Sequence, residues 1–333
     1  MATLPKELIS AGIAGVGAYL PNNIVTNEDL EKTVDTSTEW IISRSGIRER
    51  RIAPATMASS DFAVAAAGKA IADAGIAGEE IDLVIVATNT PDMVFPATAC
   101  LVQERIGAKK AGAFDLAAGC SGFMYALVVA SQFVSTGSYK NVLAIGAENL
   151  SKIIDWQDRK TCVLFGDGAG AAVVRPAEPG SGILAYKLYA DGSGGKHLNL
   201  PAGGSRMPAT HETVDNKLHY IHMSGRDIFR FAVRATARSA AEVLDMAGVK
   251  VSDVDYFIPH QANVRIIEAA AKRLGLPAEK VLSNVDRYGN TSTASIPIVL
   301  AEAVQSGRIK KGNHILMVGF GAGLTWAAAV LKW

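Results

Sequence analysis

The sequence predicts an α/β protein in which two similar halves place two mixed β-sheets around central helices. A chain of 333 residues is longer than a single hydrophobic core usually supports, so two packed units are expected. A repeat relates the halves. Strand-like runs in both are apolar throughout, which is typical of sheets that are covered on both faces.

The repeat has a spacing of 173 residues. A helix-like run, an Ala-Gly stop, a short acidic link and a strand-like run follow Phe62, and the same order follows Phe231. The Asp residues that open the two strand-like runs, Asp82 and Asp255, are separated by this spacing. Residues 1–180 and 181–333 are therefore predicted to be two copies of one α/β unit.

The predicted elements follow in chain order. Strand-like runs are LVIVAT at 83–88, VLAIGA at 142–147 and ILMVGF at 315–320. Residues 120–134 are apolar nearly all round a helical wheel, so this helix is expected between the sheets. The stretches 116–139 and 315–331 carry no charge, but Ser, Gln or Gly residues interrupt them, which favours a buried core over a membrane span. The Gly-rich, polar residues 190–219 predict a long excursion near the mouth of a site.

Charge and cysteine content argue against several classes of protein. Lys and Arg total 33 against 32 Asp and Glu, a formal net charge of +1, so nucleic acid is not an expected partner. Cys100, Cys120 and Cys162 are widely spaced and form no C-x-x-C pair, which fits a reducing cytosol. The segment MATLPKELIS does not resemble a secretory signal and predicts a short tail before the first strand. We expect a cytoplasmic protein without a membrane span.

The stretch DLAAGCSGF places Cys120 directly after Gly119, where the central helix is predicted to begin. Free N–H groups and the positive end of the helix dipole would then favour a thiolate and lower the pKa of this cysteine. The alternative is that Cys120 is a small buried apolar residue, the common fate of a free cysteine.

Two polar residues of the second copy correspond to this region. His260, in YFIPHQAN, follows the second copy's strand, and strand ends usually face the site of an α/β protein. Asn290, in YGNTSTAS, occupies the position that Cys120 has in the first copy. A structural histidine and a turn or helix-capping asparagine are the alternatives that these stretches leave open.

Other motifs give weaker indications. FGDGAG at 165–170 lacks the Lys and hydroxyl of a phosphate loop, and GFGAG at 319–323 leaves too little chain for a dinucleotide fold. His211, His219 and His222, in and just after the excursion at 190–219, have no Cys or carboxylate at ligand spacing, so no metal site is expected. TEWIISRSGIRERR could stack a base and meet phosphates through Trp40, Arg44, Arg48, Arg50 and Arg51.

In this order, the segments GCSGF, FGDGAG, IPHQAN, YGNTS and FGAGLTW resemble the β-ketoacyl-acyl-carrier-protein synthase III family, the initiating condensing enzymes of type II fatty acid synthesis. The likeness runs from about residue 10 to the C-terminus. It implies the thiolase fold, a duplicated five-layer αβαβα arrangement, and a homodimer. It also implies a catalytic triad of Cys120, His260 and Asn290.

The same resemblance implies roles for further residues. Backbone N–H groups of Cys120 and Ala322 would form the oxyanion hole, although Ala322 takes a place that is glycine in some members. Contacts to coenzyme A are implied for Trp40, Arg44, Arg159, Phe229 and Asn263. Phe165 and Met223 would line the acyl pocket, and Phe95 would reach into that of the partner subunit. Basic residues of two helix-like runs could attract an acidic acyl carrier protein; they are Arg230, Arg234, Arg265, Lys272 and Arg273.

The chemistry of the triad predicts a decarboxylative Claisen condensation on a malonyl thioester. The resemblance implies the substrates, a short acyl-CoA, acetyl-CoA by default, and malonyl-acyl carrier protein. No base strong enough to deprotonate an acetyl group is evident, because asparagine cannot accept a proton from carbon. No cofactor is expected, since coenzyme A thioesters are substrates. The alternatives are a polyketide or alkylquinolone-type synthase that uses malonyl-CoA, a cysteine thioester hydrolase, and an inactive binding scaffold.

Overall fold

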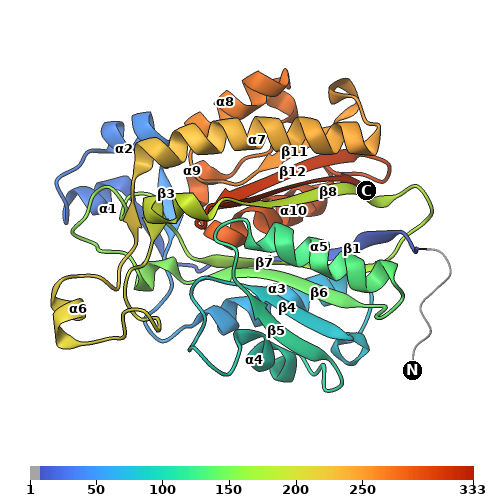
Figure 1. The fold of residues 1–333 in the computed structure, drawn as a ribbon, viewed down its shortest axis with the longest axis horizontal. Coiled ribbons are helices and arrows are strands. Elements are labelled where there is room, and N and C mark those ends of the chain that lie inside the picture. The colour runs from blue at the N-terminus through green and yellow to red at the C-terminus, as the bar shows by residue number, and fades with distance from the viewer. Residues whose placement is uncertain (1–7) are drawn as a thin grey trace.

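The computed structural model describes residues 8–333, so the predicted N-terminal tail lies largely outside the described residues. Figure 1 shows five layers: two sheets, one layer of helices between them, and one layer of helices on the outer face of each sheet. One outer layer holds α7 (Gly225–Ala247) and α8 (Val264–Leu274), and the other holds α3 (Ser59–Asp73) and α4 (Thr98–Arg105). The central layer holds α5 (Gly122–Ser135) and α10 (Ser295–Gln305).

The first sheet has five strands in the order β1-β7-β6-β4-β5. Strand β4 runs parallel to β5 and β6, whereas β7 is antiparallel to β1 and β6, so the sheet is mixed. The bounds are β1 Ala11–Tyr19, β4 Leu83–Ala87, β5 Gly112–Leu116, β6 Val142–Glu148 and β7 Gly168–Pro176. Every residue of β4 and β6 is buried, as their continuous apolar runs predict.

The second sheet has four strands in the order β11-β12-β13-β8. Strands β11 and β12 are parallel, and β13 is antiparallel to β12 and β8. The bounds are β8 Gly182–Ala190, β11 Tyr256–Pro259, β12 His314–Gly321 and β13 Thr325–Lys332. The first sheet's β5 has here only a short counterpart, an isolated bridge between Phe257 and Val281.

Corresponding elements keep the predicted spacing. Strands β4 and β11 begin at Leu83 and Tyr256, and helices α5 and α10 begin at Gly122 and Ser295; each pair is separated by 173 residues. The predicted five-layer α/β arrangement with two mixed sheets around central helices is confirmed. The predicted division at residue 180 falls in the turn between β7 and β8, and it stays a prediction of how the chain divides.

The central layer is core, as its sequence predicts. Phe123, Met124 and Leu127 of α5 are each at most 1% exposed, and α10 is buried along most of its length. Burial of a side chain of this size contributes roughly 1.5–3 kcal/mol, so α5 helps to hold the two sheets together. Within residues 8–333, no helix is long and apolar enough to cross a membrane.

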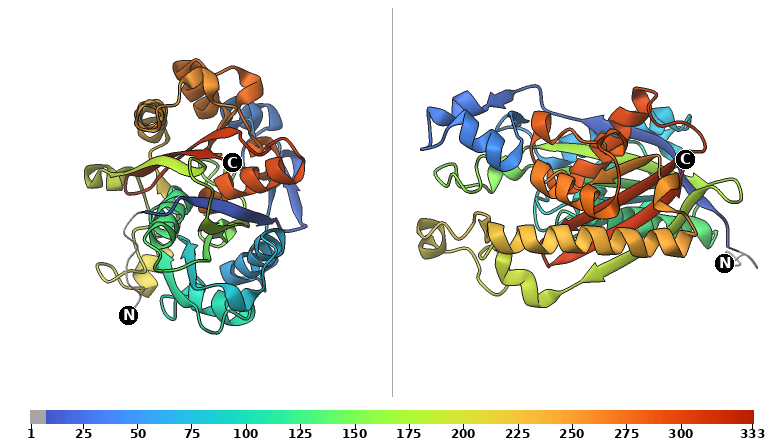
Figure 2. Two further views of the ribbon diagram at one scale, coloured as in Figure 1. Left: turned by 90° about the vertical axis from the view of Figure 1, so that its right-hand side faces the viewer. Right: turned by 90° about the horizontal axis from the view of Figure 1, so that it is seen from above.

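Smaller elements lie in the segments that connect these strands and helices. They are β2 (Ile24–Thr26), α1 (Asn27–Glu31), α2 (Thr38–Ser45), β3 (Glu49–Arg51) and α9 (Val285–Tyr288), with the short helices η1 (Gly78–Glu80), η2 (Leu150–Lys152), η4 (Val251–Asp253), η5 (Ala278–Lys280) and η6 (Ser292–Ala294). The excursion at 190–219, whose conformation the sequence leaves open, contains η3 (Gly192–His197), β9 (Leu198–Asn199) and α6 (His211–Asp215). Strand β9 pairs with β10 (His222–Met223), and α6 stands out from the body of the molecule in Figures 1 and 2.

Candidate active site

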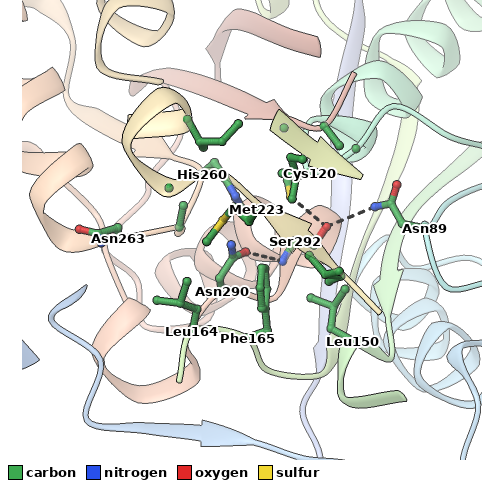
Figure 3. Close-up of a pocket in the computed structure, with 18 of the residues that line it drawn as sticks. Asn89, Cys120, Leu150, Leu164, Phe165, Met223, His260, Asn263, Asn290 and Ser292 are labelled. Atoms are coloured by element: carbon green, nitrogen blue, oxygen red, sulfur yellow. Dashed lines mark hydrogen bonds between the residues drawn. The ribbon is translucent and has the colours of Figure 1, made fainter. Parts of the chain in front are cut away.

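Cys120, His260 and Asn290 line one pocket, although 170 residues of chain separate the first from the last. The pocket has a volume of about 1180 Å³, and Figure 3 shows the three side chains around it. Cys120 lies ahead of α5, His260 follows β11, and Asn290 precedes η6. The structure therefore brings together the three residues that the sequence repeat relates.

The backbone around Cys120 is packed tightly against the turn that follows β12. Gly119 has a φ of +53°, and a Cβ at this position would lie only 2.5 Å from the amide nitrogen of Ala322. A Cβ on Gly321 would likewise collide with the amide nitrogen of Cys120. Both positions require glycine, because only a residue without a Cβ lets the two backbone segments approach so closely.

The predicted acidification of Cys120 is wrong in two respects. Helix α5 begins at Gly122 with Ser121 as its N-cap, so Cys120 lies just outside the helix and not in its first turn. The residue is partly exposed to the pocket, but the protein around its sulfur raises the pKa of the thiol to about 12. The charge of the nearby Glu148 carboxylate acts in the same direction, whereas a hydrogen bond with Ser292 opposes it. The resting thiol is therefore protonated.

His260 is a buried neutral imidazole, only 1% exposed. Burial lowers its pKa to about 3, and the edge of the ring meets the ring of Phe320. His260 Nδ1 lies 2.7 Å from Ser295 Oγ. Among the described residues, Nδ1 is the one acceptor within reach of the Ser295 hydroxyl. Ser295 therefore donates to Nδ1, and Nε2 carries the imidazole hydrogen.

Asn290 is fixed by its neighbours on both sides. Gly289 has a φ of +63°, which turns the chain so that Asn290 N–H donates to Leu164 O at 2.8 Å. The backbone N–H of Ser292 donates to Asn290 Oδ1 at 2.8 Å, as in many asparagine turns. Figure 3 shows this bond. Because Oδ1 is occupied, the carboxamide orientation is set, and Nδ2 remains as a donor toward the pocket.

The proposed oxyanion donors, Cys120 and Ala322, both line the pocket. Within residues 8–333 the only non-glycine residues with positive φ are Lys217 and Ser292, so Ala322 needs no left-handed backbone. Alanine therefore fits this turn without strain, and the role of its N–H group stays a prediction.

Four of the five predicted coenzyme A contacts line the pocket, namely Trp40, Arg44, Phe229 and Asn263. Arg159 does not line it but lies over the Trp40 ring, 5.4 Å from the centroid, and donates to Asp35 O at 2.8 Å. Asn263 caps α8 through Oδ1 and donates to Arg44 O at 2.8 Å through Nδ2. Its polar atoms thus hold Arg44 against α8.

The other arginines of TEWIISRSGIRERR were predicted to be available to phosphates, and two of them are not. Arg50 is fully buried and donates to Val163 O and Asn27 Oδ1, so it ties β3 to its neighbours. Arg51 pairs with Glu49 and does not line the pocket. Successive side chains of a strand point to opposite faces, which is why Arg50 of β3 is buried and Arg51 only partly buried.

The predicted acyl-pocket residues divide into two groups. Phe165 and Met223 both line the pocket, which Figure 3 shows. Phe95 is 83% exposed on the loop between β4 and α4 and does not line the pocket of its own chain. An exposed aromatic side chain flanked by the exposed Met93 and Val94 is compatible with contact to a second subunit.

The predicted carrier-protein residues lie on the outer helices. Arg230 and Arg265 are exposed and line the pocket mouth, and Arg265 lies over the ring of Phe229. Lys272 and Arg273 are exposed in the last turn of α8, beyond the mouth. Among residues 8–333 no group of side chains could hold a metal ion, and His219 instead bonds with Thr213.

Four polar residues belong to the site but were not predicted from the sequence. Ser292 Oγ lies 3.2 Å from Cys120 Sγ, and Ser295 holds His260; both occur in the stretch YGNTSTAS. Glu148 ends the apolar strand β6, and Asn89 follows β4. A charged residue that ends a buried strand was the available signal, since such strand ends face the site.

Family models match both parts of the chain. A model described as 3-oxoacyl-acyl-carrier-protein (ACP) synthase III matches residues 114–192, and one for the C-terminal part of the same proteins matches residues 244–333. The β-ketoacyl-ACP synthase III of Caldanaerobacter subterraneus subsp. tengcongensis is 60% identical over 327 residues, which is 98% of this chain and 99% of the relative.

Solved structures agree with these matches. The crystal structure of 3-oxoacyl-ACP synthase III from Aquifex aeolicus aligns with a TM-score of 0.90 and 51% identity, covering 97% of this chain and all of that one. The priming β-ketosynthase of a polyketide biosynthetic pathway aligns with a TM-score of 0.92 and 37% identity, covering 100% of this chain and 98% of that one.

Proposed function

Because this chain belongs to the 3-oxoacyl-ACP synthase III family, we propose that it catalyses the condensation that initiates fatty acid synthesis. The substrates would be a short acyl-CoA, acetyl-CoA by default, and malonyl-acyl carrier protein. The products would be 3-oxoacyl-acyl carrier protein, CO2 and coenzyme A. The observation that carries this proposal is that Cys120, a neutral His260 and a fixed Asn290 line one pocket.

In the first step, Cys120 Sγ attacks the carbonyl carbon of the acyl-CoA thioester. The backbone N–H groups of Cys120 and Ala322 would stabilise the oxyanion that forms. Collapse of this intermediate breaks the bond to the coenzyme A sulfur and leaves the acyl group on Cys120. The close approach of Gly119 to the backbone of Ala322 supports this step, since Cys120 and Ala322 both line the pocket.

In the second step, malonyl-acyl carrier protein loses CO2, and the electron pair of the broken bond becomes a carbanion, resonance-stabilised as an enolate. His260 Nε2 and Asn290 Nδ2 would both donate to its thioester oxygen. The carbanion then attacks the acyl thioester and expels the Cys120 sulfur. A histidine that stays neutral and a carboxamide suit this role, since the step needs donors and no carbon base.

Substrate binding is proposed along the same pocket. Trp40, Arg44 and Phe229 would hold coenzyme A or the carrier's pantetheine arm, with Phe165 and Met223 around the acyl chain. The exposed cations on α7 and α8 would attract an acidic carrier protein. We also propose that two copies associate, with Phe95 of each entering the pocket of the other, because this residue is exposed and lies outside its own pocket.

A second candidate is a polyketide-type synthase that takes malonyl units from coenzyme A. The alignment with a priming β-ketosynthase of a polyketide pathway favours it over the remaining alternatives. The deciding experiment gives the purified protein acetyl-CoA with either malonyl-acyl carrier protein or malonyl-CoA. Formation of 3-oxoacyl-acyl carrier protein is expected. Turnover with malonyl-CoA alone would favour the second candidate, free acetate a hydrolase, and no reaction an inactive scaffold.

A further inference from the structure

A buried carboxylate lies next to the nucleophile and has no role in the two steps above. Glu148, the last residue of β6, is fully buried. Within residues 8–333 it has no cationic partner, and four hydrogen bonds satisfy it instead. The donors are Asn89 N at 3.1 Å, Asn89 Nδ2 at 2.5 Å, Thr90 Oγ1 at 2.8 Å and Ser292 Oγ at 2.9 Å. Burying a carboxylate without a counter-charge is unfavourable, so a functional reason is expected.

Ser292 joins this carboxylate to the cysteine. Its Oγ lies 2.9 Å from Glu148 Oε1 and 3.2 Å from Cys120 Sγ (Figure 3 shows the contact with the sulfur). The residue is 2% exposed and has a φ of +50°, a conformation that a non-glycine residue rarely adopts. Strain of this kind persists where the surroundings hold a side chain in place for a purpose.

The donors and acceptors around Ser292 Oγ fix the direction of the hydrogen bonds. Asn89 Nδ2 donates to this oxygen at 3.3 Å. When Glu148 is ionised its carboxylate only accepts, so in this state the single hydroxyl hydrogen is directed to Glu148. One lone pair of Ser292 Oγ then remains and can accept the S–H of Cys120 at 3.2 Å. Once the sulfur has lost its proton, the same contact reverses, and Ser292 Oγ donates to the thiolate. The result is a continuous path from the thiol through the hydroxyl to the carboxylate.

His260 is not arranged to take the thiol proton. Its Nδ1 accepts from Ser295, and Nε2 already carries a hydrogen, so no imidazole lone pair is free. The raised pKa of Cys120 makes a proton acceptor necessary, and burial also raises the pKa of Glu148, which makes that carboxylate a stronger base.

We propose that Ser292 and Glu148 form a proton relay that accepts the Cys120 thiol proton during acylation and returns it after condensation. This inference rests on the proposed role of Cys120 as the nucleophile. As sulfur attacks the thioester carbon, the S–H bond breaks and its proton moves to Ser292 Oγ, while the Ser292 hydroxyl proton moves to Glu148 Oε1. The leaving coenzyme A thiolate takes a proton from solvent. When the carbanion expels the Cys120 thiolate, Glu148 returns the proton along the same path. Ser292 thus touches the reacting sulfur, and Glu148 acts through it.

Alkylation of Cys120 by iodoacetamide tests the relay without any substrate. In the wild type, the rate is expected to rise until Glu148 is ionised and then to become independent of pH, since the carboxylate takes the proton. In Glu148→Gln the same proton must leave to hydroxide, so the rate should rise about tenfold per pH unit throughout. Ser292→Ala should give this second profile as well. Equal profiles for the wild type and Glu148→Gln would overturn the relay.

The control is Ser131→Ala, which removes a buried hydroxyl that bonds within α5, away from the path. It should keep the wild-type profile. The other charged groups that line this pocket stay unchanged in every variant; they are Asp115 and, among the cations, Arg44, Lys160, Arg226, Arg230 and Arg265. Labelling by acetyl-CoA separates the two proposals. A wild type that shows the plateau with iodoacetamide but is never acylated would overturn the condensation, while still showing that Glu148 takes the Cys120 proton.

Discussion

At the scale of single residues, the site assigns different steps to different side chains. In the proposed mechanism Cys120 carries the acyl group, whereas His260 and Asn290 donate to the second substrate as neutral groups. His260→Ala and Asn290→Ala are each expected to reduce malonyl decarboxylation roughly 100-fold or more, since an oriented donor contributes about this much. Both should keep measurable acylation of Cys120. Radiolabelled malonyl substrate and labelled acyl-CoA measure the two steps, and equal loss of both would contradict the assigned roles.

The buried neutral state of His260 also predicts how stability depends on pH. Its pKa is about 3 in the folded protein and about 6.5 when unfolded. Above pH 6.5 both states are neutral and the residue adds no pH dependence. As pH falls below 6.5 the unfolded state binds a proton that the folded state does not, so stability is lost. Between pH 7 and 5 this amounts to about 2 kcal/mol.

Urea unfolding of the wild type and His260→Gln at the two pH values measures this contribution. The variant has no titrating ring, so its stability should fall less between pH 7 and pH 5, by about 2 kcal/mol. The same loss in both proteins would mean that His260 is already charged or exposed in the folded state.

How far the sequence predicts the site differs from residue to residue. The repeat relates Cys120 to Asn290 and places His260 at a strand end, because such spacing is a property of the chain alone. The protonation of Cys120 could not be predicted in this way. It depends on burial and on Glu148, which comes near only when β6 and the loop after Asn290 meet. Arg50 shows the same limit, since its burial depends on the pairing of β3.

At the scale of elements, the tight contact between Gly119 and the turn at Ala322 determines the geometry of the predicted oxyanion hole. Gly119→Ala would force a side chain into the left-handed region and against the Ala322 backbone. Strain alone costs about 1–2 kcal/mol, and the clash adds to it. We expect a loss of about 2 kcal/mol or more in unfolding free energy, together with a large loss of acylation.

Gly68→Ala is the matched control for this prediction. Gly68 lies within α3 with open space around its Cα, so alanine should stabilise the helix by roughly 0.5–1 kcal/mol. Chemical denaturation of the two variants gives both values. A Gly119→Ala protein as stable and as active as the wild type would contradict the close packing of the two turns.

Helix α8 supports a prediction about the carrier protein. Lys272 and Arg273 are exposed in its last turn and lie outside the pocket, so they can contribute charge without touching coenzyme A. Reversal of both charges to Glu should raise the KM for malonyl-acyl carrier protein about tenfold at low salt and leave acylation by acyl-CoA unchanged. Lys311→Glu, an exposed residue just before β12, is the control. An unchanged KM would place carrier binding elsewhere.

Elements were predictable where their sequence pattern is long and regular. The sequence directly predicts the apolar strands β4, β6 and β12 and the helix α5, which is apolar all round. An element that is buried on both sides must have apolar residues at nearly every position, and this pattern is easy to recognise. The excursion at 190–219 was predicted only as a long segment of undefined conformation. It contains α6 and β9, and β9 pairs with β10 just beyond it. These elements are two to five residues long, too short to give a periodic signal.

At the scale of the whole molecule, the proposed dimer links acyl selection to the partner subunit. If Phe95 enters the partner's pocket, Phe95→Ala should enlarge the acyl site. Longer acyl-CoA substrates should then gain roughly tenfold in labelling rate relative to acetyl-CoA, as expected when space for a few methylenes opens. Competition between acyl-CoA pairs, read by mass spectrometry, measures the change. No change in preference would mean that Phe95 does not bound an acyl site.

Light scattering provides the accompanying measurement of assembly. The wild type and Phe95→Ala should both have twice the chain mass of 34.9 kDa, since removal of one exposed side chain leaves most of an interface in place. A monomeric wild type would contradict the shared pocket. The sequence of one chain does not predict which protein it associates with. An exposed aromatic residue indicates a contact without identifying the partner.

The central claim is that Cys120 carries the starter acyl group, which malonyl-acyl carrier protein then removes by condensation. Intact-protein mass spectrometry tests it most directly, with acetyl-CoA added first and malonyl-acyl carrier protein afterwards. The predicted result is one acetyl group on Cys120, which then disappears as 3-oxoacyl-acyl carrier protein forms. An enzyme that never gains this mass, or that releases it as free acetate, would contradict the account.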